Sequence, residues 1–405
     1  MGALSHIVVL DLSRVLAGPF AAQILGDLGA EVIKIEKPGE GDETRHFGPP
    51  FVKAVDGAKG DAVYFLSANR NKKSVTIDFS KPEGAALVRR LARRAHVVVE
   101  NFKTGTLARY GLDYESLAAE NPGLVYCSLT GFGHDGPYKD KAGYDYLIQG
   151  MAGLMSVTGQ PEGAPGAEPM KVGVAVSDVL TGLYATIAIQ AALIHQARTG
   201  EGQAIDMALF DCQAAALVNQ AMNYLAGGMV PGRLGNAHPN IVPYQVFATA
   251  DGHLILAVAN DGQFRRFCAA AGLGELSADP RFATNAGRVD HREILGALLK
   301  PVFAGRGTAE WIGLLEAANV PCGPINRIDQ VFADPQAVAR GLRISLSHAA
   351  AGSVDLVASP LRLAKTPPEY RNAPPVLGEH TEEILRETLG ISEAGLAQLR
   401  ASGVI

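Results

Sequence analysis

An aspartate at the start of a long apolar stretch is the residue of this chain best placed to do chemistry. Asp178 follows Val176 and Ser177 and opens this stretch. An aspartate in such a position is commonly a helix N-cap, which accepts hydrogen bonds from the first backbone N–H groups. It can also be a covalent nucleophile, because N–H dipoles at a helix N-terminus stabilise oxyanions formed on an attached acyl group. The two roles are compatible.

Several other groups could bind a ligand. The glycine-rich loop Gly131–Pro137 could bring backbone N–H groups close to a ligand, although such loops mostly serve as turns. Lys37 and the cationic stretch Asn69–Lys73 could meet phosphates or simply face solvent. Arg109 comes after Asn101-Phe102, which follows a predicted parallel strand, and α/β proteins bind ligands at that end of their strands.

The cysteines and histidines do not form a metal or nucleophile motif. The four cysteines, Cys127, Cys212, Cys268 and Cys322, contain no Cys-x-x-Cys pair. No two histidines are separated by three to five residues, so the helical metal-ligand spacing is absent. We therefore expect no metal and no disulfide framework. His134 and His238 accompany no recognisable serine or cysteine nucleophile and are interpreted as structural.

Composition limits the class of protein. The chain has 405 residues, of which 47% are hydrophobic and 19% charged, which is typical of a soluble globular protein with room for two domains. A net charge of −5 argues against a nucleic-acid or anionic-membrane partner. The N-terminus lacks a signal-peptide pattern, so we expect a cytoplasmic location. The apolar segment Val172–Ile194 contains polar residues and fits a buried core helix better than a membrane span.

The elements that must position these residues follow an α/β pattern in the first part of the chain. The apolar runs His6–Leu12 and Glu31–Ile35 predict strands, and Pro19–Leu28 between them predicts a helix. Continuous apolar strands indicate a parallel sheet covered on both faces. The turn Ser13–Pro19 lacks the G-x-G-x-x-G of dinucleotide-binding proteins. Further strands and a helix are predicted over residues 74–77, 82–95, 97–99 and 124–128.

The rest of the chain changes pattern. Two apolar helices are predicted over residues 178–197 and 209–225, and the composition shifts at 226–233. Residues 244–257 read as a β-hairpin around Asp251-Gly252, and helices follow at 263–271 and 294–303. This middle segment indicates a second, smaller domain. The C-terminal part has short strands predicted over 342–347 and 354–357, then a helix from Thr381.

Longer motifs give the chain a family resemblance. The strings DLSRVLAGPFAAQILGDLGAEVIKIEKPGEGDETR, NRNKKSVTIDF, VVVENFKTGTLARYGL, CSLTGFGHDGPYKDKAGYD and GVAVSDVLTGLYA resemble the family III CoA-transferases, which include the formyl-CoA and carnitine CoA-transferases. The similarity runs from about residue 5 to about residue 390.

The resemblance implies an α/β fold with a Rossmann-like large domain formed by both chain ends and an inserted smaller α+β domain. It also implies an intertwined homodimer. On this basis, residues 1–205 are assigned to the N-terminal part of the large domain, 206–235 to a linker helix region, 236–328 to the small domain, and 329–405 to a linker and the C-terminal part of the large domain.

The family's catalytic aspartate stands in a motif that matches Gly173–Asp178, so the resemblance implies that Asp178 is the nucleophile. Its carboxylate would attack a CoA thioester to form a mixed anhydride, and the CoA thiolate would return to form an aspartyl-CoA thioester. The acceptor acid would then attack. This chemistry uses the CoA thioester as a substrate and implies no permanently bound cofactor.

The resemblance also implies contacts to CoA. The family's binding turn after the first strand matches Arg14, Val15, Leu16 and Ala17, and its basic residue after the second strand matches Lys37. Its Asn-Phe pair and following arginine match Asn101, Phe102 and Arg109. Two positions depart from formyl-CoA transferase: Leu16 stands in place of a glutamine, and Ser80, next to Lys81, in place of a lysine.

The acyl and acceptor site is implied by two further segments. The family's tyrosine-acid pair matches Tyr144-Asp145, and its glycine-rich lid is reduced here to Asn260–Gln263, which includes Gly262 and Gln263. The related α-methylacyl-CoA racemases place a histidine where this chain has Tyr144, and a tyrosine is a poor base at neutral pH. A racemase is the alternative enzyme reading, and a non-catalytic CoA-binding protein is the alternative from another class.

Three segments look most like the branch that uses succinyl-CoA and dicarboxylic acids. They are His46–Phe51, Ile241–Tyr244 and Gly323–Arg327. A dicarboxylate acceptor would need a cation for its second carboxylate, and Arg45, Arg233 and His238 are the candidates.

Overall fold

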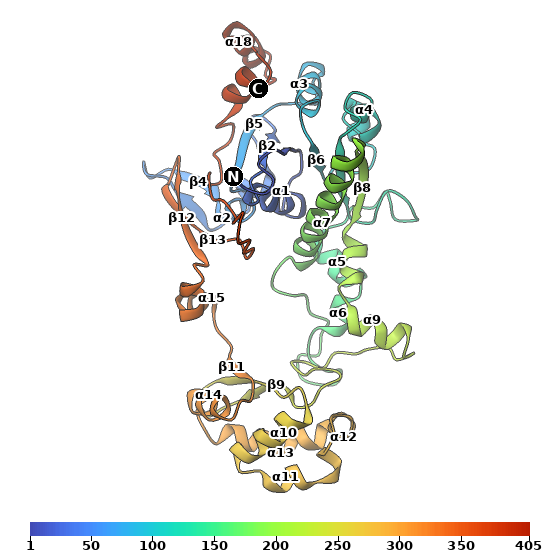
Figure 1. Cartoon of the computed structure of the whole chain (residues 1–405), viewed down its shortest axis with the longest axis vertical. Coiled ribbons are helices and arrows are strands. Elements are labelled where there is room, and N and C mark those ends of the chain that lie inside the picture. The colour runs from blue at the N-terminus through green and yellow to red at the C-terminus, as the bar shows by residue number, and fades with distance from the viewer. The chain divides into compact units, whose positions relative to one another are not determined.

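The computed structural model describes residues 1–405, which form two compact units (Figure 1). The larger unit comprises Met1–Leu154, Val172–Ala221 and Pro335–Ile405 and therefore contains both chain ends. The smaller unit comprises Met155–Lys171 and Met222–Asp334. Residues 155–171 thus group with the smaller unit, and residues 206–221 with the larger.

The larger unit is built on a six-stranded sheet in which every neighbouring pair of strands is parallel. The strands lie in the order β5-β2-β1-β6-β7-β8, so the order reverses between β1 and β6. The predicted α/β class with a parallel sheet is confirmed. The strands are β1 (Val8–Asp11), β2 (Glu31–Glu36), β5 (Lys72–Thr76), β6 (Val97–Glu100), β7 (Val125–Thr130) and β8 (Gln203–Ala208).

The central strands are apolar on both sides because helices cover both faces of the sheet. In β6, Val97 and Val99 pack into the core cluster that contains α1 and α7, whereas Val98 packs into the cluster on the opposite face. That opposite cluster contains residues of α3, α17 and α18, so the C-terminal segment completes the core begun by the N-terminal one. The five helices are α1 (Ala17–Asp27), α7 (Val176–Thr199), α3 (Pro82–Ala92), α17 (Thr381–Glu387) and α18 (Glu393–Ala401).

Shorter elements complete the larger unit. Two antiparallel hairpins pair β3 with β4 and β12 with β13. Their strands are β3 (Phe51–Lys53), β4 (Lys59–Ala62), β12 (Arg343–His348) and β13 (Gly352–Val357). The short helices are α2 (Val63–Leu66), α4 (Tyr114–Ala118), α5 (Asp145–Met151), α8 (Leu209–Ala215) and α16 (Pro335–Ala339), with 3₁₀ turns at Glu43–His46 and Leu107–Tyr110. Helices α6 (Leu154–Val157) and α9 (Val218–Leu225) each begin in the larger unit and end in the smaller.

The smaller unit has an antiparallel sheet in the order β11-β10-β9 and a core rich in aromatic rings. Phe303 stacks on Phe247 with ring centroids 4.4 Å apart and packs 4.7 Å from Trp311. The strands are β9 (Tyr244–Ala248), β10 (His253–Ala257) and β11 (Cys322–Pro324). The helices are α10 (Asp261–Ala271), α11 (Gly274–Ala278), α12 (Asn285–Asp290), α13 (Arg292–Ala304), α14 (Thr308–Ala317) and α15 (Ile328–Ala333), with a 3₁₀ turn at Pro280–Phe282.

The region 172–225 contains one strand that was not predicted, and two of its predicted helices differ in detail from the structure. Strand β8 went unpredicted because Gln203 and Asp206 interrupt its apolar pattern. The single helix expected over 209–225 is two helices, α8 and α9, separated by Ala216 and Leu217, and Val218 at the start of α9 has a φ of +38°. By length and composition alone, helix α7 could span a membrane. However, 44% of its most apolar 18-residue stretch is buried inside the protein. It is therefore only partly the buried core helix expected, since Ile187 and Ile194 are exposed.

Close packing of α1 against α7 depends on a glycine. A Cβ atom built on Gly182 would lie 2.8 Å from the carbonyl oxygen of Ala17 and 3.1 Å from Cδ1 of Phe20. Backbone contacts this short leave no room for a methyl group, so only glycine allows α7 to approach the start of α1. Gly182 lies one helical turn from Asp178, and the contact therefore sets the position of the start of α7.

Gly182→Ala is expected to push α7 away from α1 and to destabilise the protein by about 1–3 kcal/mol. Thermal unfolding measures this effect. Gly296→Ala is the matched control, because Gly296 also lies within a helix but nothing stands within 4 Å of its built Cβ. That variant should be at least as stable as the wild type, since alanine is the better helix former. Equal melting temperatures for the Gly182→Ala variant and the wild type would contradict the packing argument.

Candidate active site

A cavity of about 270 Å³ lies at the carboxyl ends of β1, β6 and β7, next to the point where the strand order reverses. Ligands of open α/β sheets bind at such a point. We call it the site cavity. Its lining includes the predicted residues Arg14, Val15, Ala17, Asn101, Phe102, Tyr144, Asp145 and Asp178. Residues from four separate segments of the chain therefore meet in one place.

Asp178 lies in the first turn of α7 but does not cap the helix. Ala175 occupies the N-cap position, and no side chain from that position accepts a hydrogen bond. The carboxylate of Asp145 supplies the cap instead, because its Oδ1 accepts hydrogen bonds from the N–H groups of Ser177 at 2.8 Å and Asp178 at 3.4 Å. The N-cap interpretation of Asp178 was therefore wrong, and the Asp178 carboxylate is left available for chemistry.

The electrostatic setting of Asp178 is unusual for an aspartate. Burial, together with the smaller effect of the nearby negative charge of Asp145, raises the pKa of Asp178 to about 7. Tyr64, in α2, is also close by: burial raises the pKa of this tyrosine, and the charges of Asp178 and Asp145 add to the effect. A carboxylate with its pKa near neutrality in a cavity is a typical feature of a functional site.

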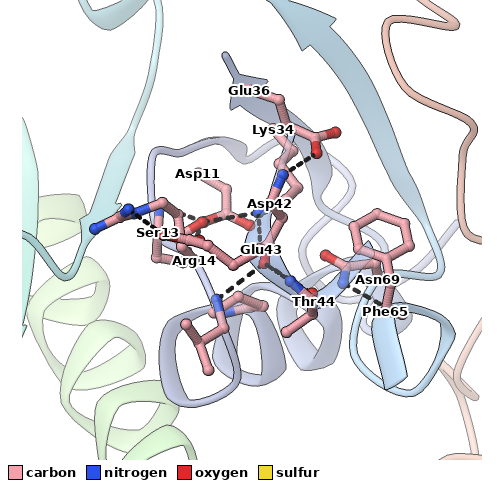
Figure 2. Close-up of polar contacts among 12 residues, drawn as sticks. Asp11, Ser13, Arg14, Lys34, Glu36, Asp42, Glu43, Thr44, Phe65 and Asn69 are labelled. Carbon is pink, nitrogen blue, oxygen red and sulfur yellow. Dashed lines mark hydrogen bonds and ion pairs between the residues drawn. The ribbon is translucent and has the colours of Figure 1, made fainter. Parts of the chain in front are cut away.

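The turn that precedes α1 is held by Asn101 and Phe102. The N–H of Arg14 donates to Oδ1 of Asn101 at 2.8 Å, and Nδ2 of Asn101 donates to the carbonyl oxygen of Arg14 at 2.6 Å. The Arg14 guanidinium lies 4.6 Å from the centre of the Phe102 ring. It also pairs with Glu43, and Figure 2 labels both of these residues. Asn101 and Phe102 therefore act on this turn and on the orientation of Arg14, besides lining the cavity.

A second cavity of about 420 Å³ adjoins the first, and the two share Arg14, Glu43 and Phe102. Lys37 and Ser80 line this adjacent cavity. Nζ of Lys37 lies 2.6 Å from Oε1 of Glu40, and this exposed pair holds the pKa of Lys37 above its usual value. Lys37 therefore lines one of two adjoining cavities and Asp178 lines the other.

Three predicted site residues lie outside both cavities. Arg109 is exposed on the 3₁₀ turn Leu107–Tyr110. Gly262 and Gln263 belong to the smaller unit, in the first turn of α10. There the Gln263 N–H donates to Oδ1 of Asn260 at 2.9 Å, so this segment forms a capped helix start.

The loop between β7 and α5 forms one side of the site cavity. Gly131 and Gly143 close its base, since a Cβ built on Gly131 would lie 2.5 Å from Cα of Gly143. Lys139 and Lys141 line the site cavity from this loop, and the sequence analysis did not single them out. Their place in the quoted string GHDGPYKDKAGYD, just before Tyr144, is the signal that could have found them.

None of the three cations suggested for a second substrate carboxylate lines the site cavity. Arg45 is buried, and its guanidinium pairs with Glu36 at 2.7 Å and Asp61 at 2.6 Å, so its charge is already balanced. Arg233 and His238 belong to the smaller unit, where Arg233 donates to the carbonyl oxygen of Gln160 at 3.1 Å. Lys139 and Lys141 are the lysines that line the site cavity together with Asp178.

The arrangement supports acyl transfer through a carboxylate nucleophile. Asp178 has a free carboxylate in a cavity, whereas the N–H groups of Ser177 and Asp178 already donate to Asp145. A free carboxylate can attack the carbonyl carbon of a bound acyl group as a covalent nucleophile. No group of three or more histidine, cysteine, aspartate or glutamate side chains gathers in the way that a metal ion requires. The fold and site thus define an α/β protein with a free aspartate carboxylate in a cavity at the carboxyl ends of its parallel strands.

Comparison with known proteins identifies the family to which the chain belongs. Residues 4–381 match the model of CoA-transferase family III. The chain belongs to this family and is a CoA-transferase.

Its relatives and neighbours extend over nearly the whole chain. It is 54% identical over 384 residues to the succinate–glutarate CoA-transferase of Agrobacterium fabrum, covering 95% of each chain. It is 43% identical to the succinyl-CoA:glutarate CoA-transferase of Mus musculus, covering 100% of this chain and 91% of the mouse protein. Among solved structures, a CaiB/BaiF family protein from Brucella suis superposes with a TM-score of 0.84 at 51% identity, covering 96% of this chain and 99% of the other.

Proposed function

We propose that this enzyme transfers CoA from succinyl-CoA to a dicarboxylic acid such as glutarate, with Asp178 as the nucleophile. The observation that carries the mechanism is the free carboxylate of Asp178 in the same cavity as the Arg14–Ala17 turn. Relatives at 54% and 43% identity bear the names of succinate–glutarate and succinyl-CoA:glutarate CoA-transferases, which supports the choice of substrates.

The first half of the reaction loads CoA onto the enzyme. A carboxylate oxygen of Asp178 attacks the thioester carbonyl carbon of succinyl-CoA, the C–S bond breaks, and CoA leaves as a thiolate. This leaves a mixed anhydride between succinate and Asp178. The thiolate then attacks the Asp178 carbonyl carbon, releasing succinate and forming an aspartyl-CoA thioester.

The second half passes CoA to the acceptor. A carboxylate oxygen of glutarate attacks the aspartyl thioester and releases the CoA thiolate, which leaves an anhydride between glutarate and Asp178. The thiolate attacks the glutaryl carbonyl carbon, giving glutaryl-CoA and the free Asp178 carboxylate. Each step exchanges one activated acyl group for another, so no proton, metal or redox equivalent enters the balance.

The other predicted site residues take these proposed roles. Arg14, Val15, Ala17, Lys37, Asn101 and Phe102 bind CoA along the two adjoining cavities, and their position in the lining supports this assignment. Arg109 is retained as a CoA contact from the resemblance alone. Tyr144 and Asp145 border the acyl group, and Gly262 and Gln263 belong to the acceptor side.

We also propose that the larger unit is a Rossmann-like domain and that the enzyme is an intertwined homodimer. The strand order β5-β2-β1-β6-β7-β8 matches the order of doubly wound dinucleotide-binding sheets. Helix α7 exposes the apolar residues Leu183, Ile187 and Ile194, and a second copy of this chain would bury them in a dimer interface. A cytoplasmic location is proposed because the four cysteines are free thiols, as expected in a reducing compartment.

The proposal is tested by incubating the enzyme with succinyl-CoA and a panel of acids, with products identified by mass spectrometry. Glutarate should yield glutaryl-CoA at a rate at least about tenfold above that of a monocarboxylate of similar length. The monocarboxylate lacks the second carboxylate and would leave the cation that binds it unpaired, which weakens catalysis. Hydroxylamine should convert Asp178 to a hydroxamate in the presence of donor. Absence of transfer to any acid would refute the proposal. Deuterium uptake at the α-carbon of a 2-methylacyl-CoA would favour the racemase instead.

A further inference from the structure

The turn between β1 and α1 contains a residue in an unfavourable backbone conformation. Val15 has a φ of +68°, in the left-handed region. A β-branched residue rarely adopts this conformation, because its Cβ crowds the neighbouring backbone. Such residues persist only where the surrounding structure holds them, and they cluster at functional sites. The neighbours of Val15 must therefore stabilise this turn.

Side chains from three other segments hold consecutive residues of the turn. Lys34, in β2, donates from Nζ to the carbonyl oxygen of Ser13 at 2.7 Å. Asn101 bonds both backbone groups of Arg14. Oδ1 of Asp42 accepts a hydrogen bond from the Val15 N–H at 3.2 Å. The contact at the strained residue itself thus comes from Asp42, which lies in the loop after β2.

Asp42 is itself fixed in place (Figure 2). Its Oδ2 lies 3.0 Å from Nζ of Lys34, and both side chains are fully buried. Its Oδ1 also accepts from the N–H of Thr44 at 3.0 Å and from the Thr44 hydroxyl at 2.7 Å, and its own N–H donates to Glu36 at 2.9 Å. Burial would raise the pKa of Asp42, but Lys34 and Thr44 hold it down at about 2. Asp42 is therefore ionised and rigid.

We propose that Asp42, held by Lys34, is a positioning residue for CoA transfer. Its carboxylate fixes Val15 in the left-handed conformation and thereby sets where Arg14 and Ala17 meet CoA. Asp42 acts through the turn and takes no part in the reacting bonds. This inference rests on the proposed function to the extent that CoA binds at the turn.

The first comparison separates the hydrogen bond to the turn from the ion pair with Lys34. Asp42→Ala removes both and is expected to weaken the binding of CoA itself, measured by isothermal titration calorimetry, by about tenfold. Asp42→Asn removes the ion pair that holds the side chain but keeps an oxygen that can accept from Val15, so its affinity should lie between those of the wild type and Asp42→Ala. In steady-state assays, the KM for succinyl-CoA should rise in Asp42→Ala while kcat changes little, because Asp178 is untouched.

The second comparison asks whether backbone strain is the link. Glycine adopts a φ of +68° without the Cβ clash, so adding Val15→Gly to Asp42→Ala should restore most of the lost CoA affinity. Loss of general stability would not be repaired in this way. Thr44→Val is the matched control, because it removes another donor to the same oxygen and leaves the Val15 contact in place. Its affinity for CoA should equal that of the wild type.

The outcomes distinguish this inference from the proposed function. Wild-type enzyme that binds CoA but transfers it to no acid would contradict the proposed function, and the affinities of the variants would still decide the role of Asp42. The inference is overturned if folded Asp42→Ala binds CoA like the wild type, if Asp42→Asn is as impaired as Asp42→Ala, or if Val15→Gly restores nothing. Should Asp42→Ala fail to fold, Lys34→Met/Asp42→Ala leaves no unpaired charge and is compared with and without Val15→Gly.

Discussion

Asp178→Asn is expected to lower the rate of CoA transfer by about 10⁴-fold or more, because the amide cannot form the anhydride and thioester intermediates. The variant should also give no hydroxamate with hydroxylamine in the presence of succinyl-CoA. Both results are read by mass spectrometry, the first on the CoA products and the second on the peptide that contains residue 178.

The same substitution should stabilise the folded protein at neutral and higher pH. The pKa of Asp178 is raised from 3.8 to about 7 in the folded state, so its ionised form costs stability. This cost is full above pH 7, declines as the pH falls towards 4, and is absent below that. We therefore expect Asp178→Asn to increase the free energy of unfolding by about 2 kcal/mol at pH 8 and by nothing measurable at pH 4.

Asp211→Asn is the control for this pair of effects. Asp211 also lies in the first turn of a helix, α8, but it is exposed and outside the site cavity. Its removal should change neither transfer nor stability appreciably. Retention of transfer by Asp178→Asn, or of a hydroxylamine-sensitive adduct, would mean that another residue carries the CoA.

Asp145 is expected to show the second-largest effect, because it both caps α7 and acts on the charge of Asp178. Wild-type activity should fall as the pH drops below about 7, since the nucleophile must be ionised. The negative charge of Asp145 contributes to raising the pKa of Asp178. Asp145→Asn removes that charge, so the acid limb of the profile of kcat/KM against pH should move to lower pH.

Asp145→Ala removes the hydrogen-bond acceptor as well as the charge. The N–H groups of Ser177 and Asp178 then lose their partner, which should cost about 1–2 kcal/mol of stability. Misplacement of the start of α7 should lower kcat by about 100-fold, whereas Asp145→Asn keeps an acceptor oxygen and should lose much less. An acid limb at the same pH in Asp145→Asn and the wild type would show that Asp145 does not tune Asp178.

Several features of this protein could be predicted from local sequence. Runs such as Val97–Val99 predict strands buried on both faces, because β-branched side chains favour extended backbone and leave no polar face for solvent. The parallel α/β fold followed from these runs. The motif around Asp178 pointed to the family, and the family was then confirmed over residues 4–381.

The details of the site depended on contacts between segments that are distant in the sequence. The sequence placed Asp178 at a helix start and favoured it as a cap, but only the fold brings Asp145, 32 residues away, to the N–H of Ser177. Likewise, Arg45 is a cation by type, and its burial against Glu36 and Asp61 appears only in the structure.

The sequence by itself therefore predicted five of the six strands of the sheet and pointed to Asp178 as the candidate nucleophile, because both depend on residue types within a short stretch of chain. The tertiary structure alone decided which charges are balanced and which backbone groups are held. Asp42 and Lys34 are unremarkable in sequence, yet together they fix the turn at Val15. Hydrogen bonds and ion pairs are fixed by distances of a few ångströms between segments, and the packing of the whole unit sets those distances.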